Sequence, residues 1–408
     1  MTNVRRGLVN MFVDDERFLQ FAAIAVGAIA ICKGLRFPNL WSATQAQIDY
    51  RHGFVKRGLF GEVVTAILGL NHYARFAMFS FLALAIVLLL LVGFVRRSGI
   101  MRSSGTGAAV VVFASSLAVT NISNLVGYFD ILEIGLTVCL LLIRRPIVRF
   151  LASLPIGAAC ILLHESFLLS FFPLLLFSFY VDFIEGRTST KTVGLQIASL
   201  TLAAFALTVA VAIRPSISMD QLPKLEQEVS SRTDFHVRHD FFLVLSRSTA
   251  DNFAKMRSLY LRRGYWYRHL SVVLALVSMV AFITFYASRF CKAAENKTVM
   301  RHAFVALILV GCMPLGIHLL GFDIDRFYSV ACIAFFLGFV LLVRSMPTVS
   351  LSLSPGMRNV MLLVVAVNMA SGEVLLDVTA PRQFPFVTSV FSYFDYFTEN
   401  HHNIQPGK

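Results

Sequence analysis

The sequence is poor in charge and lacks the short motifs that mark many soluble enzymes. Only 14% of its 408 residues are charged, whereas soluble domains usually carry about 25%. It contains no G-x-x-x-x-G-K-[ST] loop, no G-x-S-x-G elbow and no dinucleotide fingerprint, so ATP hydrolysis, serine hydrolysis and NAD chemistry are unsupported. The six cysteines include no C-x-x-C pair, so neither a disulfide framework nor a zinc site is predicted.

Long apolar runs fill most of the chain. A hydrophobic content of 57% and a mean hydropathy of +0.72 indicate a membrane protein. The pattern predicts an all-α, polytopic protein of about eleven membrane helices, in one integral membrane domain, 1–408. An interfacial or re-entrant helix is expected after the first span, from Gly58 to Asn71. The expected spans are Phe18–Leu35, Phe76–Val95, Ala108–Tyr128, Ile131–Ile143, Phe150–Leu163, Phe167–Phe183, Val193–Ile213, Leu270–Ser288, Ala303–Leu320, Phe327–Val343 and Val360–Leu376.

Basic residues mark every second short loop. Arg96 and Arg97 follow the second span, and Arg144 and Arg145 follow the fourth. Because Lys and Arg accumulate on the cytoplasmic side, we expect a cytoplasmic N-terminus in an inner (cytoplasmic) membrane, with the C-terminal tail, 377–408, outside. The net charge of +13 is assigned to loops that face anionic headgroups, so no nucleic-acid partner is expected.

Two features oppose this topology. The long loop 214–268, between the seventh and eighth spans, carries ten basic residues and yet is placed outside, where we expect it to form a helical lid on the membrane surface. The stretch Phe150–Phe183 is short for two spans and a turn. We adopt two crossings for it; a single crossing would invert the rest of the chain and make the basic loop cytoplasmic.

Charge returns in one stretch after the first span, DYRHGFVKRGLFGE. Gly53, Gly58 and Gly61 let its backbone turn sharply or approach a ligand closely. Basic side chains beside a carboxylate suit the binding of an anionic headgroup. The alternative is an interfacial helix whose Lys and Arg side chains reach lipid phosphates. The charged or titratable residues of the stretch are Asp49, Arg51, His52, Lys56, Arg57 and Glu62.

A second polar site interrupts an apolar run of over thirty residues at ILLHESFLL. His164 and Glu165 stand at the expected turn between the fifth and sixth spans. A His beside a carboxylate can act as an acid–base pair or bind a phosphate. The alternative is a hydrated hairpin tip. A metal site has little support, because the pair supplies only two ligands and no H-E-x-x-H motif follows.

A third polar site is GFDIDRF, before the tenth span. Asp323 and Asp325 can bind a divalent cation jointly while Arg326 binds a phosphate. The alternative, which is compatible with a site, is that one of the acids caps the next helix. Asp130 and Glu133 begin the fourth span, where acids favour a helix N-terminus, so a structural role is predicted for them.

Together these features resemble bacterial envelope glycosyltransferases of the GT-C type and polysaccharide polymerases of the Wzy and EpsG kind. The resemblance covers the architecture of the whole chain. It implies a catalytic acid in the first outer loop, where Asp49 stands; Tyr50 and Arg51 follow it, whereas GT-C enzymes often carry paired acids there. It also implies Arg and His side chains that hold the diphosphates of lipid-linked sugars. The matching residues are Arg51, His52, Arg57, His164 and Arg326.

The function implied is transfer or polymerisation of sugars from a polyprenyl-(di)phosphate-linked donor at the extracytoplasmic face. Cationic side chains would offset the charge on the leaving phosphate, and Asp49 or Glu165 would take the proton of the acceptor hydroxyl. The expected partners are a lipid-linked saccharide and membrane lipids, with no cofactor and with a divalent cation left open. Two alternatives stay open: a transporter or flippase for a lipid-linked or anionic solute, and a non-catalytic membrane subunit.

Overall fold

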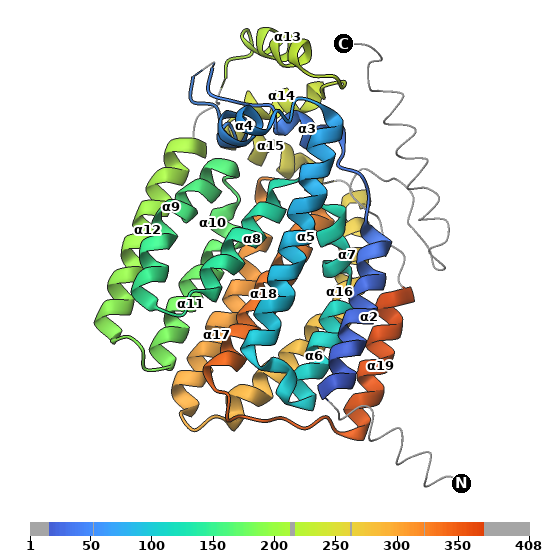
Figure 1. Cartoon of the computed structure of the whole chain (residues 1–408), viewed down its shortest axis with the longest axis vertical. Coiled ribbons are helices and arrows are strands. Elements are labelled where there is room, and N and C mark those ends of the chain that lie inside the picture. Colours follow the sequence, from blue (N-terminus) through green and yellow to red (C-terminus); the bar gives the residue numbers. More distant parts are fainter. Residues whose placement is uncertain (1–15, 52, 213–216, 262, 322, 371–408) are drawn as a thin grey trace.

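The computed structural model of the chain describes residues 16–51, 53–212, 217–261, 263–321 and 323–370. Its regular structure there is helical, and the long helices run side by side as a bundle (Figure 1). The expected C-terminal tail, 377–408, and His52 lie outside the described residues. The long helices are α2 (Glu16–Gly34), α5 (Tyr73–Ser98), α9 (Pro146–Leu163), α11 (Phe172–Ile184), α12 (Thr190–Ala212), α16 (Arg263–Ala293), α17 (Lys297–Cys312) and α18 (Ile324–Ser345).

The chain is a multi-pass membrane protein by helix length and hydropathy. In the described residues, eight helical segments are long and apolar enough to cross a membrane, and a bent pair raises the number to nine. That pair is α6 (Ser104–Ala114) and α7 (Leu117–Asn124), which meet at 47°. α8 (Phe129–Leu142) has 14 residues and α19 (Pro355–Ala370) has 16, fewer than the about 20 that span a bilayer. The expectation of about eleven spans is therefore corrected to eight or nine candidates, although the last expected span continues beyond the described residues.

The stretch Phe150–Phe183 forms two helical runs. α9 ends at Leu163, and a short turn leads into α10 (Phe167–Ser170) and then α11. Both runs are long and apolar enough to be candidate spans, and they lie side by side in Figure 1. The turn between them carries His164 and Glu165 to the end of the bundle where α18 begins.

Helix α18 is the central helix of the bundle. Its most apolar window is 94% buried, against 22% for α5 and for α12, so the other helices surround it. α17 approaches it closely at Gly311, where a Cβ would lie 2.9 Å from the Phe335 Cβ. Phe113 of α6 stacks on Phe336 with the ring centroids 3.8 Å apart. This packing holds the middle of α18 in place, and the first turn of the same helix carries Arg326.

Short helices cover the end of the bundle where α18 begins (Figure 1). They come from residues 37–72 and 217–260, and these two segments are termed the cap. The cap has its own hydrophobic core, in which Phe235, Phe241 and Phe242 are almost fully buried. Phe60 joins this core to Phe129 of α8, with ring centroids 4.9 Å apart. The cap helices are α3 (Leu40–Gln45), the π-helix η1 (Gly61–Thr65), α4 (Ala66–Leu68), α13 (Leu222–Arg232), α14 (His239–Leu245) and α15 (Thr249–Tyr260).

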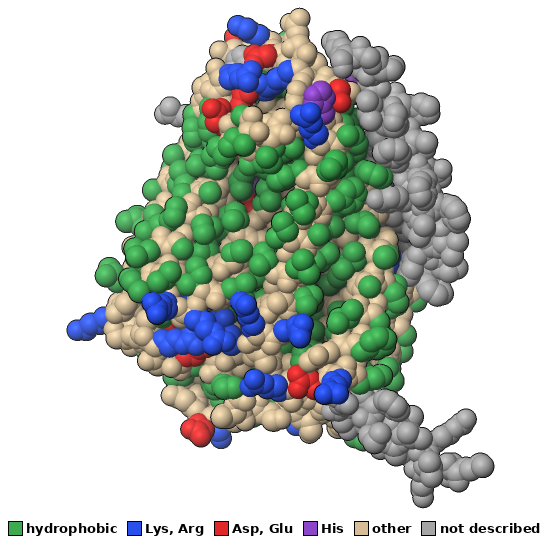
Figure 2. Space-filling view, viewed as in Figure 1, with side chains coloured by type: hydrophobic (Ala, Val, Ile, Leu, Met, Phe, Trp, Pro, Cys, Tyr) green, Lys and Arg blue, Asp and Glu red, His purple; other side chains and the backbone are tan. Residues whose placement is uncertain are grey.

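The opposite end of the bundle is rich in Lys and Arg. The connections from α8 to α9 and from α11 to α12 lie there, and they carry Arg144, Arg145, Arg187 and Lys191. Figure 2 shows blue side chains gathered at this end and a broad apolar surface between it and the cap. The two ends of the bundle therefore differ in charge as well as in structure.

Candidate functional site

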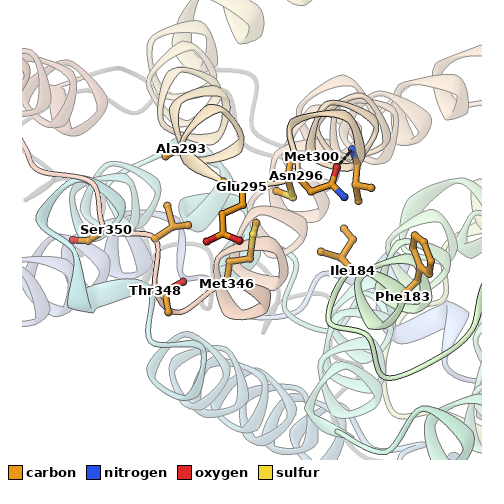
Figure 3. Close-up of a pocket in the computed structure, with 12 residues that line it drawn as sticks. Phe183, Ile184, Ala293, Glu295, Asn296, Met300, Met346, Thr348 and Ser350 are labelled. Carbon is orange, nitrogen blue, oxygen red and sulfur yellow. Dashed lines mark hydrogen bonds between the residues drawn. The ribbon is translucent and has the colours of Figure 1, made fainter.

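One cavity lies at the end of the bundle opposite the cap. It has a volume of about 670 Å³, and its polar lining comes from Glu295, Asn296, Thr348 and Ser350 (Figure 3). No Lys or Arg lines it, and none of the residues singled out from the sequence does. An anionic ligand has no charged partner of opposite sign there.

A second cavity, of about 380 Å³, lies between the cap and the bundle and is termed the cap cavity. Its size falls within the range of ordinary small-molecule sites, about 300–1,000 Å³. Its walls include apolar side chains of α10 and α12, among them Leu168, Leu169 and Val209. Five basic side chains line it against two carboxylates. These charged residues are Lys56, Arg57, Arg247, Lys255, Arg326, Glu165 and Asp323.

An ion pair joins the first loop to the α9–α10 turn inside the cap cavity. Arg57 Nε and Nη2 donate to the two carboxylate oxygens of Glu165 over 3.2 and 2.9 Å. Arg57 has a φ of +65° and is the one non-glycine residue of the described chain with a positive φ. Such a backbone costs about 1–3 kcal/mol and is found mostly at functional sites. The next residue must be small, because a Cβ at Gly58 would lie 2.6 Å from the Tyr50 ring.

The neighbouring His164 is held neutral. Burial, together with the charges of Arg57 and Arg326, lowers its pKa well below the usual range, against the opposing effect of Glu165. Its Nε2 lies 3.2 Å from Arg326 Nη2, and because a guanidinium can only donate, Nε2 accepts. On the other side of the ring, Nδ1 lies 2.6 Å from Ser166 Oγ and 3.1 Å from the Ser166 backbone nitrogen. A neutral imidazole whose Nε2 already accepts a hydrogen bond from Arg326 is poorly placed to act as a base. Its role here is to orient Arg326.

Glu165 stays ionised in spite of its surroundings. Burial would raise its pKa, but the charge of Arg57 and the Arg57 hydrogen bonds together hold the pKa far below its usual range. Lys56 acts in the same direction. In this arrangement the carboxylate is a weak base.

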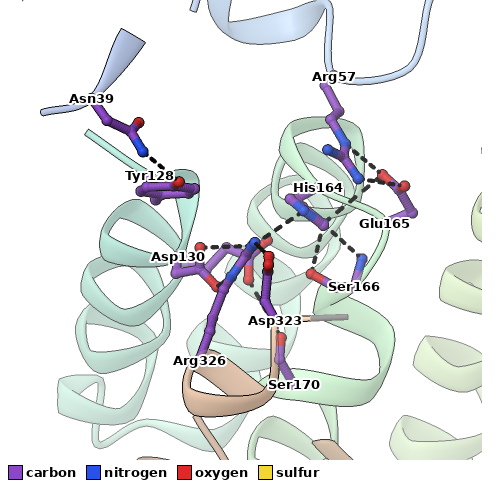
Figure 4. Close-up of polar contacts among 11 residues, drawn as sticks. Asn39, Arg57, Tyr128, Asp130, His164, Glu165, Ser166, Ser170, Asp323 and Arg326 are labelled. Atoms are coloured by element: carbon purple, nitrogen blue, oxygen red, sulfur yellow. Dashed lines mark hydrogen bonds and ion pairs between the residues drawn. The ribbon is translucent and has the colours of Figure 1, made fainter. Parts of the chain in front are cut away.

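Arg326 fixes the floor of the cap cavity. Its Nε donates to Asp130 Oδ1 over 2.9 Å and its Nη1 donates to Asp323 Oδ2 over 3.1 Å (Figure 4). The guanidinium also lies 5.5 Å from the centre of the Tyr128 ring. One cation faces two carboxylates, so the charge of Arg326 is already balanced by the protein.

The remaining basic residues lie on the cap side of the cavity. Lys56 Nζ donates to the Arg247 carbonyl over 2.9 Å. Burial lowers the pKa of Lys56, with Glu165 opposing this and Arg57 adding to it. Burial and the charge of Arg247 likewise lower the pKa of Lys255. Like charges are thus held near one another, and a bound anion would relieve their repulsion.

Asp49 and Arg51 lie apart from the cap cavity. Asp49 Oδ2 is 2.7 Å from Arg232 Nη1 of α13 and 3.3 Å from Arg51 Nε. Arg51 also reaches Glu228 over 3.5 Å, and its side chain is 62% exposed. Neither residue lines the cavity. In the structure Asp49 fastens α13 to the first loop.

The two acids of GFDIDRF face different partners. Asp323 binds Arg326, whereas Asp325 Oδ2 binds Arg268 Nη2 over 2.9 Å and does not line the cap cavity. Asp323 occupies the N-cap position of α18, but its side chain makes no capping hydrogen bond. Among the described residues, no group of three or more His, Cys, Asp or Glu side chains is placed to hold a metal ion. Joint binding of a cation by the two acids is not supported by these partners.

The structure adds cavity residues from the long loop that the sequence reasoning did not single out. Thr249, Asn252 and Lys255 of α15 all line the cavity. Their spacing of three residues places them on one face of a helix, so the sequence alone could have indicated them. Arg247 lies just before the N-cap of α15, and no spacing in the sequence indicates it.

No protein-family model, curated protein sequence or solved structure matches the chain. A function must therefore be inferred from the residues themselves. The cap cavity brings together Lys56, Arg57, His164, Glu165 and Arg326 from three separate segments. It is the best candidate site in the described part of the chain.

Acidification is expected to destabilise the protein through His164. Below pH about 6.5 an unfolded His binds a proton, whereas the folded His164, between Arg57 and Arg326, does not. Stability should fall by up to about 1.4 kcal/mol per pH unit for this group. The depressed pKa of Glu165 acts in the same direction, but only at lower pH. Thermal melts at pH 7.5 and 5.5 should show a smaller loss in His164→Gln than in the wild type.

The matched control for this measurement is His239→Gln, because the His239 side chain is 63% exposed on the cap. It should keep the full wild-type loss of stability on acidification. Equal losses in wild type and His164→Gln would mean that His164 is not held neutral.

Asp49→Asn is expected to weaken the cap. The change leaves Arg232, whose side chain is 20% exposed, without its closest carboxylate, at a cost of about 1–3 kcal/mol. Asp240→Asn, in an exposed pair with Arg238, should change stability by less than about 1 kcal/mol. Thermal melts of the two variants measure the difference. A loss of stability no larger in Asp49→Asn than in Asp240→Asn would mean that Asp49 does not fasten α13 to the first loop.

Proposed function

We propose that the chain transfers or polymerises sugars in bacterial envelope polysaccharide or glycoconjugate synthesis. In this proposal the cap cavity binds the phosphate of a polyprenyl-(di)phosphate-linked donor at the extracytoplasmic face. The observation that carries it is the placement of five basic side chains beside apolar walls in one cavity. A lipid phosphate needs both kinds of surface at the same depth.

The orientation is supported by the distribution of basic loops. Arg144, Arg145, Arg187 and Lys191 lie at the end opposite the cap, and such loops stay on the cytoplasmic side. The cap and its cavity then face outward from an inner membrane. In this orientation the cavity, at the cap end of the candidate spans, would open at the depth where the phosphate of a lipid donor lies.

The charges of the cavity suit glycosyl transfer. The acceptor oxygen attacks the anomeric carbon, and the bond from that carbon to the phosphate oxygen breaks with its electron pair leaving on the phosphate. Arg57 and Lys56 stabilise the charge on the leaving group. Asp130 and Asp323, which together outweigh Arg326, favour the positive charge that develops on the sugar ring. The acceptor proton passes to a carboxylate that lines the cavity, and Glu165 is the nearest to Arg57.

A transporter or flippase is the second candidate. Lys33 and Arg36 are at most 2% exposed at the end of α2, and charges buried inside a membrane bundle often mark a solute path. The break between α6 and α7 is a further feature of transporter helices. Arg36 Nε donates to the Asn124 carbonyl over 2.9 Å, which accounts for part of this charge by structure alone.

Arg57→Ala is expected to abolish envelope polymer in a cell that depends on this chain, without lowering the protein level. Loss of one preorganised donor to a leaving group costs about 10²–10³ in rate. Arg57→Lys keeps the charge but loses the two-pronged contact, and it should retain partial activity. Arg145→Ala, exposed at the opposite end of the bundle, is the control. Wild-type polymer from Arg57→Ala would remove the enzyme proposal for this cavity.

A further inference from the structure

We propose that Glu165 is an internal stand-in for the donor phosphate: it holds Arg57 until the phosphate displaces it, and the released carboxylate then accepts the acceptor's proton. This inference rests on the proposed function and adds an order of events to it. The Arg57–Glu165 contact thus holds Arg57 in position before the donor binds, and it prevents the Glu165 carboxylate from acting as a base until then.

The geometry of the pair is that of a ligand contact. Two carboxylate oxygens take two N–H groups of one guanidinium over 2.9 and 3.2 Å, which is also how a phosphate binds an arginine. Both residues line the cap cavity. The Arg57 and Glu165 side chains are 11% and 23% exposed, so an incoming anion can reach the pair without unfolding the cap.

The backbone gives independent support. Arg57 holds a left-handed φ of +65°, a conformation that the surrounding structure has to maintain. The strain aims the guanidinium at the cavity, where a purely structural salt bridge would need no such conformation. Lys56, the preceding residue, lines the same cavity. A phosphate, with more oxygens and more charge than a carboxylate, can engage both side chains and so replace Glu165.

Displacement changes the chemistry of Glu165. Arg57 is the largest influence that lowers the pKa of this carboxyl, through its charge and its hydrogen bonds. Once the phosphate accepts the hydrogen bonds of Arg57, these no longer counter the effect of burial, and the pKa of Glu165 rises. The freed carboxylate lies beside His164, whose Nδ1 is 3.9 Å from Glu165 Oε2.

The reaction then balances in one step. The acceptor O–H bond breaks as the new bond from oxygen to the anomeric carbon forms, and the proton moves to a Glu165 oxygen. The leaving phosphate keeps the electron pair of the broken sugar–phosphate bond and its hydrogen bonds to Arg57. Donor must bind before the base is available, so the order is donor first and acceptor second.

The test measures the affinity of farnesyl phosphate, a short polyprenyl phosphate, for the purified full-length protein in detergent. Farnesol serves as the probe that lacks the phosphate. An internal competitor reduces affinity by the fraction of molecules in which it occupies the site. Glu165→Gln is therefore expected to bind farnesyl phosphate about tenfold more tightly than the wild type, while losing envelope polymer.

The matched control is Asp323→Asn, which removes one negative charge from the same cavity but contacts Arg326 and not Arg57. It should tighten binding much less than Glu165→Gln does. In an Arg57→Ala background, Glu165→Gln should no longer tighten binding, because the contested partner is gone. Glu165→Asp shortens the side chain and so weakens the contact with Arg57, and it should tighten binding of farnesyl phosphate by a smaller factor. It replaces Glu165→Gln if that variant does not fold.

Equal or weaker binding by Glu165→Gln than by Asp323→Asn would overturn the inference, since Glu165 would then position Arg57 and not compete for it. If the wild-type protein nevertheless bound farnesyl phosphate more tightly than farnesol, the proposed function would still hold. If no variant distinguished farnesyl phosphate from farnesol, the proposed function and the inference would both be wrong.

Discussion

The guanidinium of Arg326 holds together the segments on which the cap cavity is built. It reaches Asp130 at the start of α8, His164 in the α9–α10 turn and Asp323 just before α18. Its own helix, α18, is the buried centre of the bundle, so these three segments are held against the most tightly packed helix of the structure. Its charge is balanced by two carboxylates, and removing either partner would leave a buried charge with less compensation.

The result is a cavity with two electrostatic halves. The floor around Arg326 is balanced or slightly negative. The side formed by Lys56, Arg57, Arg247 and Lys255 has Glu165 as its one lining carboxylate. Such a division suits a reaction in which negative charge leaves in one direction while positive charge develops in the other. The four basic residues of that side all come from the cap: Lys56 and Arg57 from its first segment, and Arg247 and Lys255 from its second. Glu165, Asp323 and Arg326 come from the bundle beneath it.

Much of the fold could be read from the sequence, because apolar length is a local property. The helical runs around Phe150–Phe183 and along α18 follow from it. The number of spans could not be read so well, because α8 is apolar but too short to cross alone. Nothing in a hydropathy pattern separates a full crossing from a short helix that packs inside a bundle.

The site could be predicted in part, for a related reason. His164, Glu165 and Arg326 stood out because charge inside an apolar run is costly, and the structure brings them together with Arg57. Asp49 stood out equally and yet pairs with Arg232, a partner 183 residues away, which no local pattern reveals. The cap residues Arg247 and Lys255 belong to an ordinary polar segment, so their role depends on how the cap docks.

The most direct test of the account is a cryo-EM structure of the full chain in a lipid nanodisc with a bound polyprenyl phosphate. The account predicts that the phosphate lies in the cap cavity, within hydrogen-bond distance of Arg57 and Lys56. A phosphate bound beside Asp49 and Arg51 on the outer edge of the cap, or in the cavity lined by Glu295, would contradict it.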